Sequence, residues 1–168
     1  MRSIAGVKTH IKRAAIISKN VTSLLGGGGV DGAIHQAAGW ELLEECRKLN
    51  GCATGLAKIT KDYNLPARWV IHTVGPVWQD GNHGEDELLA SFYRICLALA
   101  VQHGIRTIAF PSISTGAYGF PLERATAIAV REVKNFVEQN PSIEKVVFVC
   151  FGSPAYDFYR NTVKQAIA

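Results

Sequence analysis

The sequence predicts a single α/β domain, spanning residues 1–168, in which one sheet is covered by helices on both faces. Segments with strand character alternate with segments of helical periodicity along the chain, which is the order that builds layered α/β folds. The strand segments are apolar at successive positions, as expected for strands buried on both faces. No internal repeat and no linker divides the 168 residues, a length typical of one domain.

The beginning of the chain fits two different elements, whereas the rest divides clearly. Apolar residues from Ile4 to Ala15 recur at helical spacing, yet residues 14–17 (AAII) also form a short buried strand pattern. A polar surface loop is expected at 79–86. Strands are expected at 57–60, 69–74, 107–110 and 145–151, and helices at 30–38, 40–49, 87–103, 122–139 and 158–167.

Composition excludes several classes of protein. No apolar run is long enough to span a bilayer, so no membrane association is expected. The net charge is only +4 and no block of Lys and Arg appears, so no nucleic-acid partner is expected. The four cysteines form no CxxC pair and are expected to be free thiols in a reducing, cytoplasmic compartment.

Two glycine-rich loops are the most informative feature. The segment LLGGGGVDGAIHQAAGW (24–40) contains four consecutive glycines and opens a helix, and PSISTGAYGFP (111–121) connects a strand to the next helix. Loops at the carboxyl ends of strands in an open α/β sheet lie along the ligand-binding edge. Their backbone N–H groups can bind phosphate oxygens. Since neither loop carries a lysine, a diphosphate without a metal ion fits better than a triphosphate with magnesium.

Other phosphate and catalytic motifs match less well. Gly27, Gly29 and Gly32 satisfy GxGxxG, but the expected ribose-binding acid is missing, because Glu44 and Glu45 fall inside a predicted helix. The chain has no Walker A, GxSxG or HExxH motif. Its five histidines show no metal-ligand spacing, so neither a metal nor a cofactor is expected.

Four segments together resemble the macrodomain family, specifically its MacroD-type branch. They are SLLGGGGVDGAIHQAAG (23–39), ATGLAKIT (53–60), LPARWVIHTVGP (65–76) and FPSISTGAYGFP (110–121). The resemblance implies a three-layer α/β/α fold with a mixed central sheet. It also implies a monomer that binds ADP-ribose or ADP-ribosylated protein. Such domains remove mono-ADP-ribose from acidic side chains or deacetylate O-acetyl-ADP-ribose.

The resemblance also implies the site residues. In the first loop, the diphosphate and distal ribose would contact Gly28, Gly29, Val30, Asp31, Gly32 and Ala33. The second phosphate loop would be Ser114, Thr115, Gly116, Ala117, Tyr118, Gly119 and Phe120. Phe120 and Phe151 would flank the proximal ribose and adenine. Asp31 matches the catalytic aspartate and could orient or deprotonate a water, although a simple helix N-cap is the alternative role. His72 is expected to be a hydrogen-bonded core residue.

The resemblance fails before Thr22. Val7 stands where the family has an adenine-binding aspartate, and Val21 stands where it has the asparagine that positions ribose and water. Asn20 could take the catalytic asparagine's place only if the loop held one extra residue. Four functions therefore remain: a hydrolase, a reader that binds ADP-ribose without turnover, a regulatory or RNA-binding domain, and a Rossmann-type NAD enzyme. The last two are disfavoured by the missing basic patch and the missing ribose acid.

Overall fold

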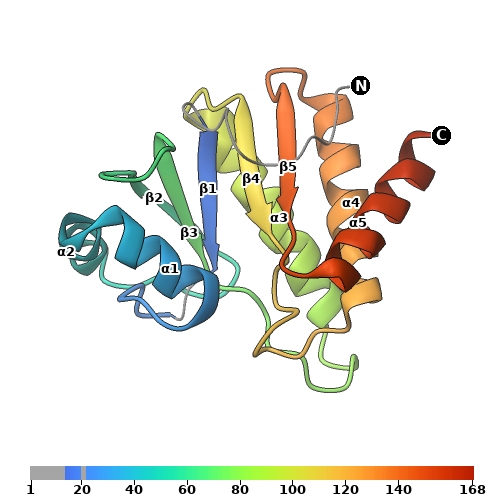
Figure 1. Cartoon of the computed structure of the whole chain (residues 1–168), viewed down its shortest axis with the longest axis horizontal. Helices are drawn as coiled ribbons and strands as arrows, with labels where there is room; N and C mark the ends of the chain where they lie inside the picture. Colours follow the sequence, from blue (N-terminus) through green and yellow to red (C-terminus); the bar gives the residue numbers. More distant parts are fainter. Residues whose placement is uncertain (1–13, 20–21) are drawn as a thin grey trace.

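The computed structural model describes residues 14–19 and 22–168. Within them the chain forms one sheet flanked by helices (Figure 1). The strands are β1 (Ala14–Lys19), β2 (Ala57–Lys61), β3 (Trp69–Thr73), β4 (Thr107–Pro111) and β5 (Lys145–Val149). The helices are α1 (Gly29–Ala38), α2 (Trp40–Lys48), α3 (Glu85–Gln102), α4 (Leu122–Gln139) and α5 (Ser153–Ile167).

The sheet is mixed, with the strand order β2-β3-β1-β4-β5. β2 runs antiparallel to β3, while β1 is parallel to both of its neighbours, β3 and β4, and β4 is parallel to β5. Parallel neighbours end at the same edge of a sheet. The glycine loops that follow β1 and β4 therefore leave adjacent strands on one side of the molecule, the lower side in Figure 1.

Two hydrophobic clusters cover opposite faces of the sheet. Val70 packs with residues of α1 and α2, whereas its neighbour Ile71 packs with residues of α3 and α4. Successive strand residues point to opposite faces, so the two clusters lie on either side of β3. α5 completes the second cluster, where its Tyr159 ring lies 4.8 Å from that of Phe148. The predicted three-layer arrangement is confirmed.

Several details differ from the sequence prediction or resolve it, among them α5, which begins at Ser153 and not at residue 158. Residues 14–17 are part of a strand, β1, and the helical alternative for them is wrong. β5 lies at the sheet edge, so its residues are half-buried or exposed rather than buried on both faces. The predicted surface loop at 79–86 ends early, since α3 begins at Glu85, whose side chain is buried. No helix of the described residues is long and apolar enough to cross a membrane.

Glu85 organises the segment before α3. Its carboxylate accepts hydrogen bonds from the backbone N–H groups of Gln79 (3.1 Å), Gly81 (3.1 Å) and His83 (2.7 Å). Burial by itself raises the pKa of Glu85, but these bonds and one from its own N–H outweigh that effect and lower the pKa to about 2. The segment that Glu85 holds includes Trp78, whose ring lies 4.7 Å from Phe120 of the second glycine loop.

Replacing Glu85 by glutamine is expected to reduce stability at neutral pH and to flatten its acid dependence. The folded-state pKa of about 2 lies below the ordinary value of 4.5. The stabilisation is therefore present above pH 4.5 and is lost as the pH falls toward 2. Urea unfolding at several pH values should show the parent losing stability over this window and the variant losing less. Equal slopes for the two proteins would contradict this assignment.

Candidate functional site

The first glycine loop brings backbone N–H groups to the N-terminus of α1. Gly26 and Gly29 adopt left-handed φ values of 86° and 63°, which explains glycine at these positions. α1 begins at Gly29, and its N-cap is Gly28, which offers no side chain to cap the first turn. The N–H groups of a first turn without a capping side chain can bind an anion.

The packing of α1 against this loop depends on Gly32. A Cβ atom at Gly32 would lie 2.3 Å from the carbonyl oxygen of Gly27, far inside van der Waals contact. Only a glycine at position 32 therefore allows the helix and the loop to lie this close together. Leu24, fully buried, anchors the beginning of the loop in the cluster beneath α1 and α2.

The second loop is held by its own backbone. The N–H of Phe120 donates to the carbonyl of Ser114 (2.9 Å), and the N–H of Gly119 donates to that of Gly116 (2.9 Å). Ser114 and Gly119 both have left-handed φ values, 60° and 68°. The Ser114 hydroxyl is buried and has no hydrogen-bond partner among the described residues, which suits a group that a polar ligand would satisfy.

Tyr118 connects the second loop to the segment that Glu85 organises. Its carbonyl accepts a 2.9 Å hydrogen bond from the N–H of Trp78. Phe120 is buried against Trp78 and only 2% exposed, whereas Phe151, directly after β5, is 99% exposed. The two aromatic residues that the resemblance places around the nucleoside thus differ in role. Phe120 helps to hold the loop, and Phe151 presents an open ring.

Asp31 lies buried between β1 and the first loop. It is 3% exposed, and its Oδ1 accepts a 2.7 Å hydrogen bond from the hydroxyl of Ser18 on β1. The same oxygen is 3.7 Å from Nε2 of His35, one helical turn further on. Oδ2 faces the loop, because a Cβ atom at the position of Gly27 would lie 3.6 Å from it. The alternative that Asp31 is the helix N-cap is wrong, because Gly28 occupies that position.

The remaining predicted site residues differ in their exposure to solvent. Along the two loops the structure leaves several of them exposed to solvent: Gly28, Gly29, Val30, Ala33, Gly116, Ala117 and Gly119. Thr115 is partly buried, and its hydroxyl lies 2.8 Å from that of Ser112. Asn20, Val21 and Val7 lie outside the described residues.

A buried polar cluster lies beside Asp31 and was not predicted from the sequence. His72 of β3 is fully buried, 2.8 Å from the hydroxyl of Thr60 and 3.8 Å from Sγ of Cys46. Burial, assisted by the nearby His35, lowers the pKa of His72 to about 3, so its imidazole is neutral at physiological pH. The prediction of a hydrogen-bonded core histidine is confirmed. No local pattern could reveal its neighbours, since Cys46 is 26 residues away in sequence.

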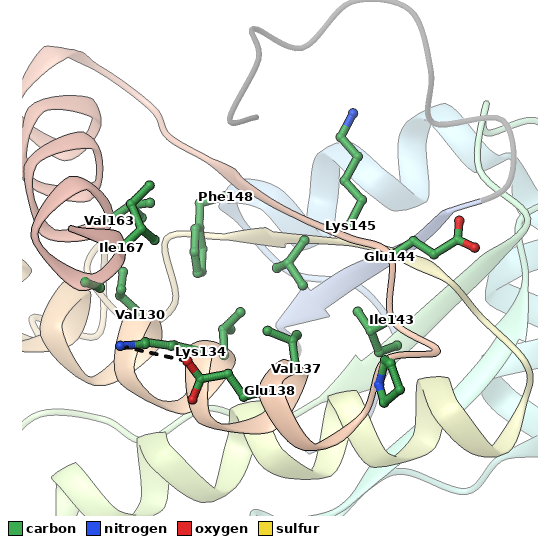
Figure 2. A pocket seen from close by; sticks show the side chains of 14 residues that line it. Val130, Lys134, Val137, Glu138, Ile143, Glu144, Lys145, Phe148, Val163 and Ile167 are labelled. Carbon is green, nitrogen blue, oxygen red and sulfur yellow. Dashed lines mark ion pairs between the residues drawn. The ribbon is translucent and has the colours of Figure 1, made fainter. Parts of the chain in front are cut away.

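One hollow of the described residues lies outside the two glycine loops. A groove of about 540 Å³ runs between α4, β5 and α5, and includes Val137, Phe148 and Val163 (Figure 2). A Lys134–Glu138 ion pair of 3.9 Å lies at its side. None of its lining residues belongs to either glycine loop. Its lining combines apolar side chains with Lys134, Glu138, Glu144 and Lys145, and the groove is separate from the candidate site.

Comparison with known proteins identifies the family. The family model for the macro domain matches residues 20–129. A macro domain-containing protein of Chlorobaculum tepidum is 62% identical over 155 residues, covering 92% of this chain and 90% of the relative. A Pantoea vagans protein named O-acetyl-ADP-ribose deacetylase 2 is 52% identical over 160 residues, covering 93% and 94%. A Trypanosoma brucei macrodomain solved in complex with ADP-ribose superposes with a TM-score of 0.85 at 45% identity, covering 90% of this chain and 64% of the other. The chain belongs to the macro domain family.

Proposed function

We propose that this chain binds ADP-ribose with its pyrophosphate between the two glycine loops. The proposal rests on the position of the two loops. They follow the adjacent parallel strands β1 and β4 and therefore lie at the same edge of the sheet. Each loop leads into a helix, α1 or α4, and neither contains a lysine. Backbone N–H groups at two helix N-termini suit a diphosphate that carries no bound metal ion. The ADP-ribose in the Trypanosoma brucei relative supports the same ligand.

We further propose that the bound molecule is an ester of ADP-ribose and that the chain hydrolyses it. Mono-ADP-ribose on an acidic side chain and O-acetyl-ADP-ribose are both such esters. Water adds across the ester bond, giving ADP-ribose and a free carboxylic acid. Asp31 would orient that water and accept its proton, a role that suits a carboxylate held by Ser18 on one oxygen and facing the loop with the other. The deacetylase name of the Pantoea vagans relative supports this chemistry.

A reader function is the second candidate, and one sequence feature favours it. Val21 stands where the resemblance places an asparagine that positions the ribose and the water. Valine has no side-chain hydrogen bond to offer, and a missing bond to a buried polar group costs about 1–3 kcal/mol. Such a loss would slow turnover more than it would prevent binding.

Titration calorimetry with ADP-ribose and with NAD tests the proposal. We expect ADP-ribose to bind with one-to-one stoichiometry and more tightly than NAD. In NAD the distal ribose carries nicotinamide on its anomeric carbon, whereas in ADP-ribose that carbon carries a free hydroxyl group. Tighter binding of NAD would favour a dinucleotide enzyme instead. Incubation with glutamate-linked ADP-ribosyl protein and with O-acetyl-ADP-ribose then separates the two candidates. Release of ADP-ribose supports the hydrolase, and binding without release supports the reader.

A further inference from the structure

Three metal-ligating side chains meet beneath α1, although they are far apart in the sequence. They are His35 of α1, Cys46 of α2 and His72 of β3, and their donor atoms all lie within 4.8 Å of one another. Cys46 and His72 are fully buried, and the His35 side chain is 11% exposed. The cluster lies directly beside the first glycine loop, since the His35 ring is next to Gly26 and its Nε2 atom is 3.7 Å from Oδ1 of Asp31.

The distance between the Cys46 and His72 donors is close to that of a tetrahedral zinc site. Zinc binds nitrogen at about 2.0–2.1 Å and thiolate sulfur at about 2.3 Å, so adjacent nitrogen and sulfur ligands are separated by about 3.6 Å. The Cys46 Sγ and His72 Nε2 atoms are already 3.8 Å apart. The three donors, which lie within 4.8 Å of one another, must move closer together to bind one ion.

His35 provides a second, independent indication. Its Nε2 atom is buried and makes no hydrogen bond among the described residues. An imidazole nitrogen withdrawn from water without a partner costs about 1–3 kcal/mol, and a bound metal ion would remove that cost. The nearest acidic atom is Oδ1 of Asp31, at 3.7 Å. A carboxylate at this distance can offset the charge of the ion through Oδ1, while Oδ2 still faces the loop.

We propose that His35, Cys46 and His72 bind one zinc ion, with the Asp31 carboxylate near the fourth coordination position. A thiolate and two imidazoles select zinc over magnesium or calcium, which prefer oxygen ligands. Binding releases one proton, from the Cys46 thiol, and changes no oxidation state. Thr60 would lose its bond to His72 but would keep the 3.2 Å bond from its hydroxyl to the carbonyl of Lys61. The ion would tie α1, α2 and β3 together.

Cobalt substitution tests the site through a signal that does not depend on catalysis or on ADP-ribose. Cobalt(II) replaces zinc and gives an intense thiolate-to-metal charge-transfer band only when a cysteine is a ligand. A triple variant, Cys52→Ala, Cys96→Ala and Cys150→Ala, leaves Cys46 as the only thiol of the chain. We expect this variant to bind one equivalent of cobalt with the band, and we expect Cys46→Ala to lack it. Absence of the band from the triple variant, or its persistence in Cys46→Ala, would overturn the proposal.

A second measurement uses substitutions that leave the core cysteines intact. Zinc affinity, measured by competition with a chromophoric chelator, is compared for the parent, His35→Gln and His83→Gln. His83 is the matched control, an exposed histidine that lies 3.6 Å from Asp80 as His35 lies near Asp31. We expect His35→Gln to weaken zinc binding at least about tenfold and His83→Gln to leave it unchanged. Equal affinities for all three proteins, or no binding by the folded parent, would contradict the site.

Discussion

Replacing Asp31 by alanine is expected to lower the rate of ADP-ribosyl ester hydrolysis by about 10²–10⁴-fold, the usual contribution of a positioned general base. Binding of ADP-ribose should change much less, because the proposed pyrophosphate contacts come from backbone N–H groups of the two loops. Single-turnover hydrolysis and calorimetry on the same preparation separate the two effects. A variant that keeps the parent's rate would show that Asp31 does not take part in the chemistry.

Asp31→Asn is the control for folding. The alanine variant leaves the buried Ser18 hydroxyl without the acceptor it now has at 2.7 Å, which costs about 1–3 kcal/mol of stability. Asparagine keeps the shape of the side chain and an oxygen for Ser18, but it cannot accept a proton from water. We therefore expect it to recover most of the lost stability and none of the lost rate. Recovery of both would indicate that Asp31 acts only through the packing of α1.

Replacing Gly32 by alanine is expected to disrupt the first loop. Glycine inside a helix normally costs about 1 kcal/mol relative to alanine, so the exchange would stabilise an unconstrained helix. Here the new Cβ would lie 2.3 Å from the carbonyl oxygen of Gly27. Forced overpacking of this kind costs about 1–3 kcal/mol. We expect a net loss of stability in urea unfolding and a loss of ADP-ribose affinity of at least about tenfold, since the loop must move away from α1.

Gly116→Ala is the matched control for stability. Gly116 is in the second loop, its Cβ would meet nothing within 4 Å, and its φ is not left-handed. We expect this variant to unfold within about 0.5 kcal/mol of the parent, as exposed substitutions usually do. If Gly32→Ala were as stable as Gly116→Ala and bound ADP-ribose normally, the close packing of loop and helix would have no functional role.

The parts of this fold that could be predicted from the sequence are those encoded by local patterns. α4 was predicted with its observed bounds. Pro121 precedes a long segment whose apolar residues recur at helical spacing, and a strand would not explain that spacing. The first glycine loop was predicted from its four consecutive glycines, and the second from its small residues between a strand and a helix. Residues 14–17 fit both a helix and a strand, and only pairing with β3 and β4 decides between them.

The features that were missed depend on contacts between distant segments. Ser18 has no motif of its own, and its importance comes from the carboxylate of Asp31, thirteen residues further along the chain. Glu85 looked like part of a polar loop because nothing in the sequence shows that three backbone N–H groups surround its carboxylate. The histidine–cysteine cluster has no ligand spacing, since each of its members comes from a different element.

A crystal structure of the protein soaked with excess ADP-ribose tests the central claim most directly. We predict that the pyrophosphate lies between residues 28–33 and 114–120, within hydrogen-bonding distance of backbone N–H groups from both loops. A carboxylate oxygen of Asp31 should face the distal ribose. A pyrophosphate bound away from both loops, or no ligand between them at saturating ADP-ribose, would contradict the account.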